Sequence, residues 1–306
     1  MAKRRKSGGK QRASSRRAAT TKVDLQAKID EVMQRQQAEK LAVAEQVLAE
    51  SEDDRKESSL TPWQIAWRGI GWASWLVVVW LLSSLMVSAL IVFMRSRVGY
   101  NALGDTIGSA LMQVLQLVLM LVMVVGIPYK LGKNKLLTPA KRRAAKMKLL
   151  GIGRLPSKED VLPWLLGVVG YYLLAFILTA LASLVLPDSL MTQAQYTGFN
   201  ANSWGGAILI VFILAVITPI FEELIFRGFL LGNLQRLAGF WPAAIITSLL
   251  FAVAHGQVNV GLVTFVLSMI ACYQRKRTGT TWAGMGLHMV VNLVAASLVF
   301  IMPLMA

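Results

Sequence analysis

The sequence predicts an all-α membrane protein, a polytopic bundle of about seven transmembrane helices with a catalytic cavity among the late spans. The first observation is composition, because 55% of the 306 residues are hydrophobic and the mean hydropathy is +0.55. Such a chain is too apolar for a soluble domain of this length. The second observation is that apolar runs of about 20 residues, enough to cross a bilayer, recur after the first quarter of the chain.

The chain begins with a basic tail. Residues 1–22 are rich in Lys, Arg, Ser, Gly and Ala and contain no acidic residue, so we expect a disordered cytosolic tail. Residues 23–62 favour helix but carry an interrupted apolar stripe, which is typical of a polar helical or spacer segment. No cleavable signal peptide is expected, because no apolar core appears until after Trp63.

The net charge of +16 comes mainly from this tail and from a loop between Lys130 and Lys158. A basic arm can bind nucleic acid, but basic segments beside membrane spans more commonly set the topology and contact anionic lipids. We therefore expect the lipid bilayer, with anionic lipids at the basic segments, as a partner, and we do not expect nucleic acid. Cys272 is the only cysteine, which excludes an intrachain disulfide and a thiolate metal cluster.

Residues 63–160 are expected to form the first two spans and a basic cytosolic loop. The spans cover about 72–94 and 107–129, and tryptophans around the start of the first are placed as an interfacial belt would be. Within the loop, residues 139–150 have the composition of a basic amphipathic helix that lies on the membrane.

Residues 161–306 are expected to hold the remaining five spans. Their approximate bounds are 161–186, 205–234, 241–255, 258–273 and 281–306. A compact basic loop, residues 275–277, precedes the last span. Under the positive-inside rule, the basic segments place the N-terminus in the cytosol and make the chain a multi-pass protein of the cell membrane.

The strongest functional signal is a charged motif within the span that begins near residue 205. It contains Glu222, Glu223 and Arg227, and a charge at the bilayer centre costs about 2.5–3.5 kcal/mol on insertion scales. Glu223 and Arg227 are four residues apart on a helix, so we expect them to form a structural ion pair. This leaves Glu222 as the unpaired carboxylate, either a catalytic group or a hydrogen-bonded acid that serves structure or proton relay.

The chain has only two histidines, His255 and His288, and both fall in predicted spans. Asn292 follows His288 by four residues and shares its helical face. These residue types suit the attack of water on an amide. A carboxylate and an imidazole can hold and deprotonate the water, while a second imidazole and an amide donor can stabilise the oxyanion. The simpler alternative for the histidines is hydrogen bonding between helices.

A metal site is a further possibility from the residue types. Glu222, His255 and His288 match the ligand set of catalytic zinc sites, although they come from three different helices and no H-E-x-x-H pair occurs. Zinc therefore stays open as a cofactor, and we favour a site without metal.

Three motifs together resemble the CPBP family of intramembrane proteases, which includes CAAX prenyl-endopeptidases and the bacteriocin-processing or immunity proteins also called Abi proteins. The motifs are E-E-x-x-x-R from Glu222, F-x-x-x-H from Phe251 and H-x-x-x-N from His288. The resemblance covers about residues 160–306 and implies a helical bundle with a cavity open to the cytosol. It also implies that Glu222 and His255 activate water while His288 and Asn292 face the oxyanion. Family members are described both as metalloproteases and as glutamate-dependent proteases.

We therefore expect a membrane endopeptidase that hydrolyses a peptide bond of a membrane-associated protein or peptide. CAAX processing itself is not expected, because it needs prenylated substrates. Two alternatives from other classes stay open: a non-catalytic bacteriocin-immunity or scaffold protein, and a proton-coupled transporter that uses the same side chains as a relay. The transporter alternative is weakened because no paired halves are visible in the sequence.

Overall fold

The computed structural model divides the chain into two units, Met1–Thr61 and Pro62–Ala306. The residues that the structure describes are 33, 34, 37, 60–98, 105–131, 139–193, 196 and 203–305. In the first unit, the described residues 33, 34 and 37 are helical and exposed, and residues 60 and 61 precede the first helix of the second unit. The predicted disordered tail, 1–22, lies outside the described residues, as does nearly all of the predicted spacer.

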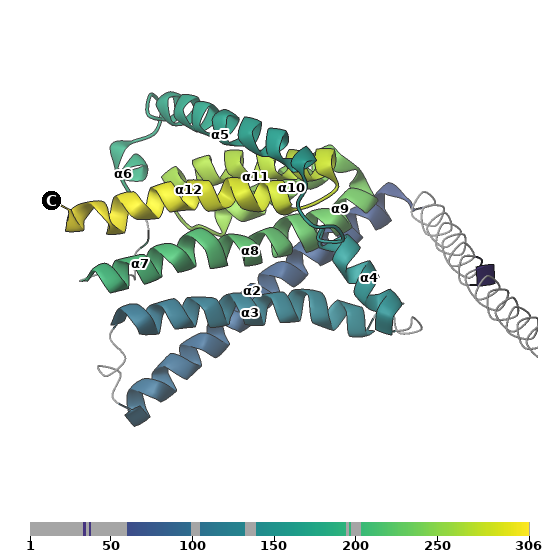
Figure 1. The fold of residues 1–306 in the computed structure, drawn as a ribbon, viewed down its shortest axis with the longest axis horizontal. Helices are drawn as coiled ribbons and strands as arrows, with labels where there is room; N and C mark the ends of the chain where they lie inside the picture. The colour runs from purple at the N-terminus through teal and green to yellow at the C-terminus, as the bar shows by residue number, and fades with distance from the viewer. Residues whose placement is uncertain are drawn as a thin grey trace, which may run out of the picture. The chain divides into compact units, whose positions relative to one another are not determined.

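The second unit is a bundle of helices (Figure 1), and its described residues include six helices long and apolar enough to cross a membrane, plus the shorter apolar helix Phe240–Val253. The predicted polytopic helical bundle is therefore confirmed. Its first two helices are α2 (Pro62–Val98) and α3 (Asp105–Leu131), which pack against each other. Helix α2 begins earlier than expected, with a proline in its first turn, where the missing N–H has no intrahelical partner to lose.

Helix α4 (Pro139–Leu149) is the basic helix expected in the loop, and its C-terminal end is packed tightly against the bundle. Leu149 and Leu150 fill the space left by two glycines four residues apart. A Cβ atom added to Gly228 would lie 3.0 Å from Leu150 Cδ2, and one added to Gly232 would lie 2.9 Å from Leu149 Cδ1. Arg275 also donates to the Leu149 carbonyl at 2.6 Å. Glycine at these two positions thus allows α4 to dock.

The span with the charged motif is continuously helical, and two π-helical turns interrupt its α-helical winding. Its segments in order are α7 (Trp204–Phe212), the π-helical turn η4 (Ile213–Ile217), α8 (Thr218–Glu223), the π-helical turn η5 (Leu224–Leu230) and α9 (Leu231–Ala238). Pro219 accounts for the first interruption, because it has no N–H and its ring would clash with the carbonyl of residue 215 in a regular α-helix. Single π turns within helices are frequent at functional sites.

The remaining long helices are α5 (Val161–Ala182), α10 (Phe240–Val253), α11 (Val258–Thr278) and α12 (Trp282–Phe300). Helix α5 packs on α11 and α12. The prediction of a basic loop at residues 275–277 is wrong, because these residues form the last turn of α11. Cations are favourable there, beside the carbonyl end of the helix dipole, and Gly279, with φ of 71°, ends the helix in the left-handed conformation.

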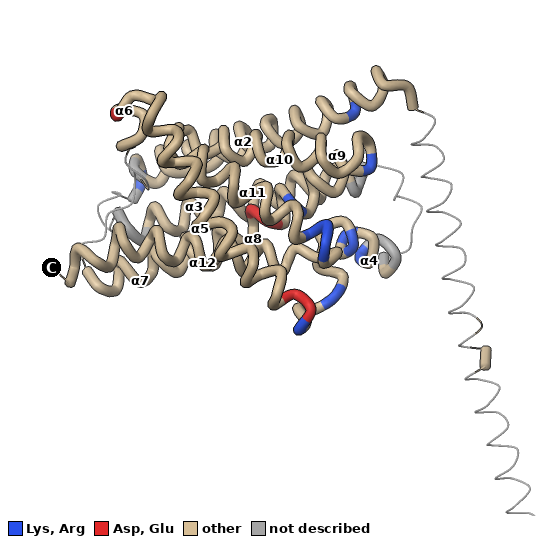
Figure 2. Tube along the Cα trace, turned by 90° about the horizontal axis from the view of Figure 1, so that it is seen from above, with Lys and Arg blue, Asp and Glu red and all other residues tan. Residues whose placement is uncertain are grey.

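The cationic residues of the second unit gather at one end of the bundle. Figure 2 shows most of the described Lys and Arg residues around α4 and the neighbouring helix ends, whereas acidic residues of α8 lie inside the bundle. The predicted orientation, with the N-terminus in the cytosol, stays a prediction.

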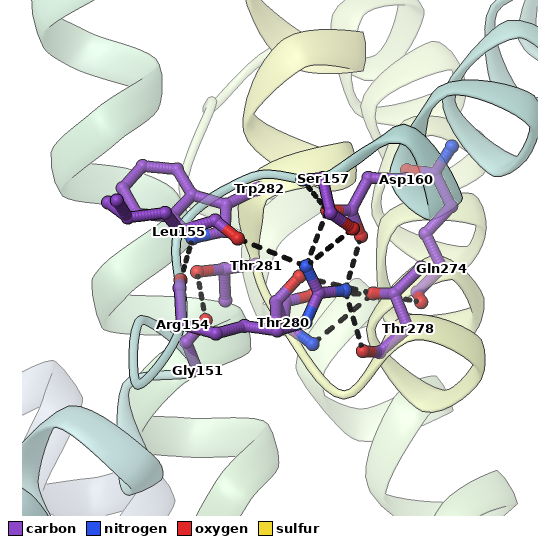
Figure 3. Close-up of polar contacts among 10 residues, drawn as sticks. All are labelled: Gly151, Arg154, Leu155, Ser157, Asp160, Gln274, Thr278, Thr280, Thr281 and Trp282. Atoms are coloured by element: carbon purple, nitrogen blue, oxygen red, sulfur yellow. Dashed lines mark hydrogen bonds and ion pairs between the residues drawn. The ribbon is translucent and has the colours of Figure 1, made fainter.

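Polar contacts join the α4–α5 connection to the turn between α11 and α12 (Figure 3). Two N–H groups of Arg154 donate to the carboxylate of Asp160 at 2.7 Å each, and the guanidinium also reaches the Thr278 carbonyl at 3.2 Å. The nearby carboxylate raises the pKa of the Arg154 guanidinium above its ordinary value. Trp282, the first residue of α12, donates its indole N–H to the Arg154 carbonyl at 2.6 Å. These contacts, here named the α4–α5 clasp, fix the start of α12.

Candidate active site

The residues singled out in the sequence come from three elements of the bundle. Glu222 and Glu223 end helix α8, His255 follows the end of α10, and His288 lies in the middle of α12. The chain turns sharply after His255, where Gly256 has φ of 68°, a conformation that glycine adopts without strain. The histidine therefore sits, half-buried, in a turn and not on a continuing helix.

Glu223 is the centre of a buried polar cluster. Its Oε1 atom lies 2.9 Å from Nη1 of Arg227 and 3.1 Å from Nδ1 of His288, and all three side chains are almost fully buried. Although Arg227 Nη1 is close to the carboxylate, its N–H is not aligned for a hydrogen bond. The guanidinium instead lies over the ring of Phe251, 4.3 Å from its centroid. The Glu223 carboxylate thus holds the side chains of Arg227 and His288 in place.

Glu222 has a different environment although it is the adjacent residue. Its carboxylate lies 3.6 Å from Nε2 of His288, and 19% of its side chain is accessible. The accessible part faces a cavity of about 510 Å³, whose wall also contains His255. This volume lies within the range of about 300–1,000 Å³ that is usual for ligand pockets. Glu222 and His255 are therefore the two ionisable groups of the predicted set that reach the same open space.

The orientation of His255 is set by its own chain. Its Nδ1 atom lies 2.8 Å from the Phe251 carbonyl oxygen, so a proton on Nδ1 would be donated there. In that tautomer Nε2 carries the free lone pair. The ring of Phe251 packs against both histidines, with centroid distances of 4.9 Å to His255 and 5.7 Å to His288. Phe251, the first residue of its motif, thus positions both imidazoles.

Asn292 lies next to a different part of the span. Its amide nitrogen donates to the Leu214 carbonyl at 2.9 Å, within the π turn η4, and Asn292 is not part of the cavity wall. His288 is also outside the cavity wall, behind Glu222. The structure therefore places Glu222 beside His288 and in the same cavity wall as His255, while the described amide contact of Asn292 links α12 to η4.

The opposite wall of the cavity comes from helices that the sequence reasoning left without a functional role. Helix α2 contributes Trp80 and its neighbours, and α3 contributes Gln113 and Gln116. Trp80 and Val253, on either side of the cavity, are 42% and 75% exposed on the outer surface of the bundle, so the cavity reaches the surface between α2 and α10. Two glutamines three residues apart in an otherwise apolar span were the available signal in the sequence.

The residue types of the candidate site also allow a zinc ion. Glu222 and His288 approach each other, but no group of three or more His, Cys, Asp or Glu side chains able to hold a metal ion occurs in the described part of the chain. The arrangement of Glu222, His255 and His288 therefore does not fit a zinc ion held by all three side chains.

Residues 204–294 match the family model of the type II CAAX prenyl endopeptidase Rce1-like proteins. An uncharacterized 24.3 kDa protein of Escherichia coli is 30% identical over 133 residues, which are 42% of this chain and 59% of that protein. A Bacillus subtilis (strain 168) protein named "Putative membrane peptidase YdiL" is 27% identical over 84 residues, which are 28% of this chain and 34% of that protein. The chain thus spans less than two thirds of either relative.

No solved structure matches the chain. The family match and the geometry nevertheless agree on the same segment, because α8, the end of α10 and the middle of α12 all lie between residues 204 and 294. Residues 204–294, which hold all three motifs, therefore form an Rce1-like segment of this membrane protein, and the resemblance expected from those motifs is confirmed.

Proposed function

We propose that the chain is a membrane endopeptidase that hydrolyses a peptide bond of a membrane-associated protein or peptide with water activated by Glu222 and His255. The observation that carries the proposal is that the two adjacent carboxylates have different environments. Glu223 is fully buried against Arg227 and His288, whereas Glu222 is open to the cavity that His255 also lines. The family match of residues 204–294 and the name of the Bacillus subtilis relative support a membrane protease.

In the proposed reaction, Glu222 accepts a proton from a water molecule in the cavity, and Nε2 of His255 orients that water by accepting its other proton in a hydrogen bond. The water oxygen then attacks the carbonyl carbon of the peptide bond, and the carbonyl oxygen takes up the negative charge. Collapse of this intermediate breaks the C–N bond, and the proton held by Glu222 passes to the leaving nitrogen. General base catalysis of this kind contributes about 10²–10⁴-fold in rate.

We assign the oxyanion side of the reaction to His288 and Asn292, and because neither side chain lines the cavity, this assignment requires the substrate carbonyl oxygen to enter beside Glu222. His288 lies beside Glu222, and its ring is held from behind by Glu223. Asn292 uses one N–H of its amide on the Leu214 carbonyl, and an amide group has a second N–H donor. Removal of one oxyanion donor costs about 10²–10³-fold in kcat in proteases where it has been measured.

The setting of the reaction follows from the fold. We place the chain in the cell membrane with its N-terminus in the cytosol and with anionic lipids against the basic helix α4. Six apolar helices and the cationic end of the bundle support this placement. Substrates are peptides or proteins at the membrane, because the cavity reaches the apolar outer surface of the bundle between α2 and α10.

The test is cleavage of a quenched fluorogenic peptide library by the purified protein in detergent. We expect cleavage by the wild type and a loss of at least about 100-fold in Glu222→Gln and in His255→Ala, with each variant still folded. Leu111→Ala, on the outer face of α3, is the matched control and should retain full activity. Absence of cleavage by the wild type would contradict the proposal and favour the scaffold or immunity alternative.

A chelator arm of the same assay addresses the cofactor. Activity that survives a strong chelator and is lost in both variants indicates a protease that depends on glutamate and not on metal. Loss with chelator, followed by recovery with added zinc, would overturn the assignment of Glu222 and His255 as water-activating groups and make them metal ligands.

A further inference from the structure

Helix α3 has an unusual polar face at the level of the cavity. Between Ser109 and Tyr129 its only polar side chains are Gln113 and Gln116. Both line the cavity, together with Leu117 and Met120, and the spacing of these four residues places them on one face of the helix. Polar side chains in transmembrane helices are costly unless they face a polar interior or a partner, so this face indicates a binding surface.

The two glutamines are used differently. Gln116 donates from its amide nitrogen to the hydroxyl oxygen of Ser84 at 2.7 Å, which joins α3 to α2. Gln113 is half-buried, and no hydrogen bond from its amide to any described residue is present. Because Gln113 lines the cavity, the donor and the acceptor of its amide can form hydrogen bonds with a ligand in the cavity.

The chemistry of an amide side chain fits one ligand class well. A carboxamide offers an N–H donor and a carbonyl acceptor side by side, the same pair that each unit of a peptide main chain presents. A peptide that is not helical has unsatisfied main-chain groups within a membrane, and these must find protein partners. The opposite wall of the cavity carries Glu222 and His255, so a peptide bound along α3 would lie between the amide and the reactive groups.

We propose that Gln113 binds the main chain of a substrate peptide in the cavity and so positions the scissile bond against Glu222. This inference rests on the proposed function, and it assigns a substrate-binding role to a helix outside the Rce1-like segment. Gln116, through Ser84, holds the polar face of α3 in register with α2. Gln113 is a binding and positioning residue in this scheme, and it takes no part in the proton transfers.

The test measures binding in protein that carries Glu222→Gln, so that cleavage is not needed. The probe is a fluorescein-labelled apolar peptide of Leu, Ala and Gly residues, and its Kd is measured by fluorescence anisotropy in detergent. Gln113→Met, which keeps the length of the side chain and removes the amide, should weaken binding by about three- to tenfold, the effect of about one net hydrogen bond. Leu111→Ala is the control and should bind as the parent protein does.

A second set of measurements distinguishes binding of the peptide main chain by Gln113 from an effect of the substitution on the shape of the cavity. In a series of the same peptide, one amide at a time is replaced by an ester, which removes a single N–H donor. At one position the ester should bind about threefold or more weakly than the amide when Gln113 is present, and equally well in the Gln113→Met protein. Equal loss in both proteins, or a Kd changed by less than about twofold in Gln113→Met, overturns the inference.

The same experiment distinguishes this inference from the proposed function. If the wild type fails to cleave the library but the ester effect depends on Gln113, the protein binds peptides and the protease assignment is wrong. If the wild type cleaves peptides and Gln113→Met leaves both KM and Kd unchanged, the protease assignment stands and the role of Gln113 is wrong. A parent protein that does not bind the probe peptide also overturns the inference.

Discussion

The Glu223 carboxylate lies 2.9 Å from the Arg227 guanidinium, and neither side chain has any accessible surface. Two opposite charges within one helical turn can share a membrane interior only as a pair, because either charge alone would be buried without compensation. The pair therefore stabilises the site only while both members are present.

Single substitutions at this pair should be more damaging than the double substitution. Removing one partner of a buried ion pair costs about 3–5 kcal/mol, so Arg227→Leu should strongly lower the thermal stability of the protein in detergent. Glu223→Gln with Arg227→Leu should recover much of that loss, as measured by the melting temperature. A double variant that is no more stable than Arg227→Leu would show that the pair is not the source of the effect.

Gly284 on α12 is a second point at which packing controls the site. A Cβ atom at this position would lie 3.0 Å from Glu223 Oε2 and 3.2 Å from the Ala271 side chain. We expect Gly284→Ala to push Glu223 out of place and with it His288, which lowers kcat more than it raises KM. Gly170→Ala is the control, because Gly170 lies in α5 with open space around it, and the change should stabilise the helix slightly, by about 0.5–1 kcal/mol. Equal kinetics for the two variants would contradict the prediction.

Asn292 provides a test of the oxyanion assignment. Asn292→Ala removes both amide donors, and we expect kcat to fall by about 10²–10³-fold with little change in KM. Its contact with the Leu214 carbonyl predicts some loss of thermal stability as well. Asn292→Asp keeps the size of the side chain but lacks N–H donors, so it should be as inactive as the alanine variant. An active alanine variant would rule out donation from this residue.

The α4–α5 clasp should contribute to activity at a distance. Asp160→Asn weakens its bonds to Arg154, which also binds the chain beside α12, so we expect a lower melting temperature and a moderate loss of kcat. Glu159→Gln, an exposed acidic neighbour, is the matched control and should change neither quantity.

Much of the fold could be predicted from local sequence, because a membrane span is a property of one continuous apolar run. The runs predicted to begin near residues 72, 107, 161 and 281 are all helices, although the observed helices begin and end at somewhat different residues. The basic residues 275–277 were misassigned to a loop, since charge alone does not distinguish a loop from the last turn of a helix. The helix continues to Thr278 and ends at Gly279, which adopts the left-handed conformation. The glycine was therefore the better signal in the sequence for the end of this helix.

The site was only partly visible in the sequence. The spacing of Glu223 and Arg227 indicates their contact, because residues four apart meet on any helix. The placement of Glu222 beside His288, and the sharing of one cavity with His255, depend on how three helices pack and leave no local pattern. The contacts of Arg154 with Asp160 and Thr278, across 124 residues in the second case, were missed for the same reason.

The π turn η5 has a consequence for how the faces of the long span are aligned. Glu222 and Leu234 are twelve residues apart. In an uninterrupted α-helix, their side chains would therefore point in directions that differ by about 120° around the helix axis. A π turn accommodates about one extra residue, which reduces the difference to about 20°. Leu234 indeed packs beside Gly69 of α2, and Glu222 shares a cavity with Leu76 of the same helix. One added residue in the helix thus rotates a carboxylate toward α2 without shifting the packing of α9, so deletion of a single residue in η5 would turn Glu222 away from the cavity.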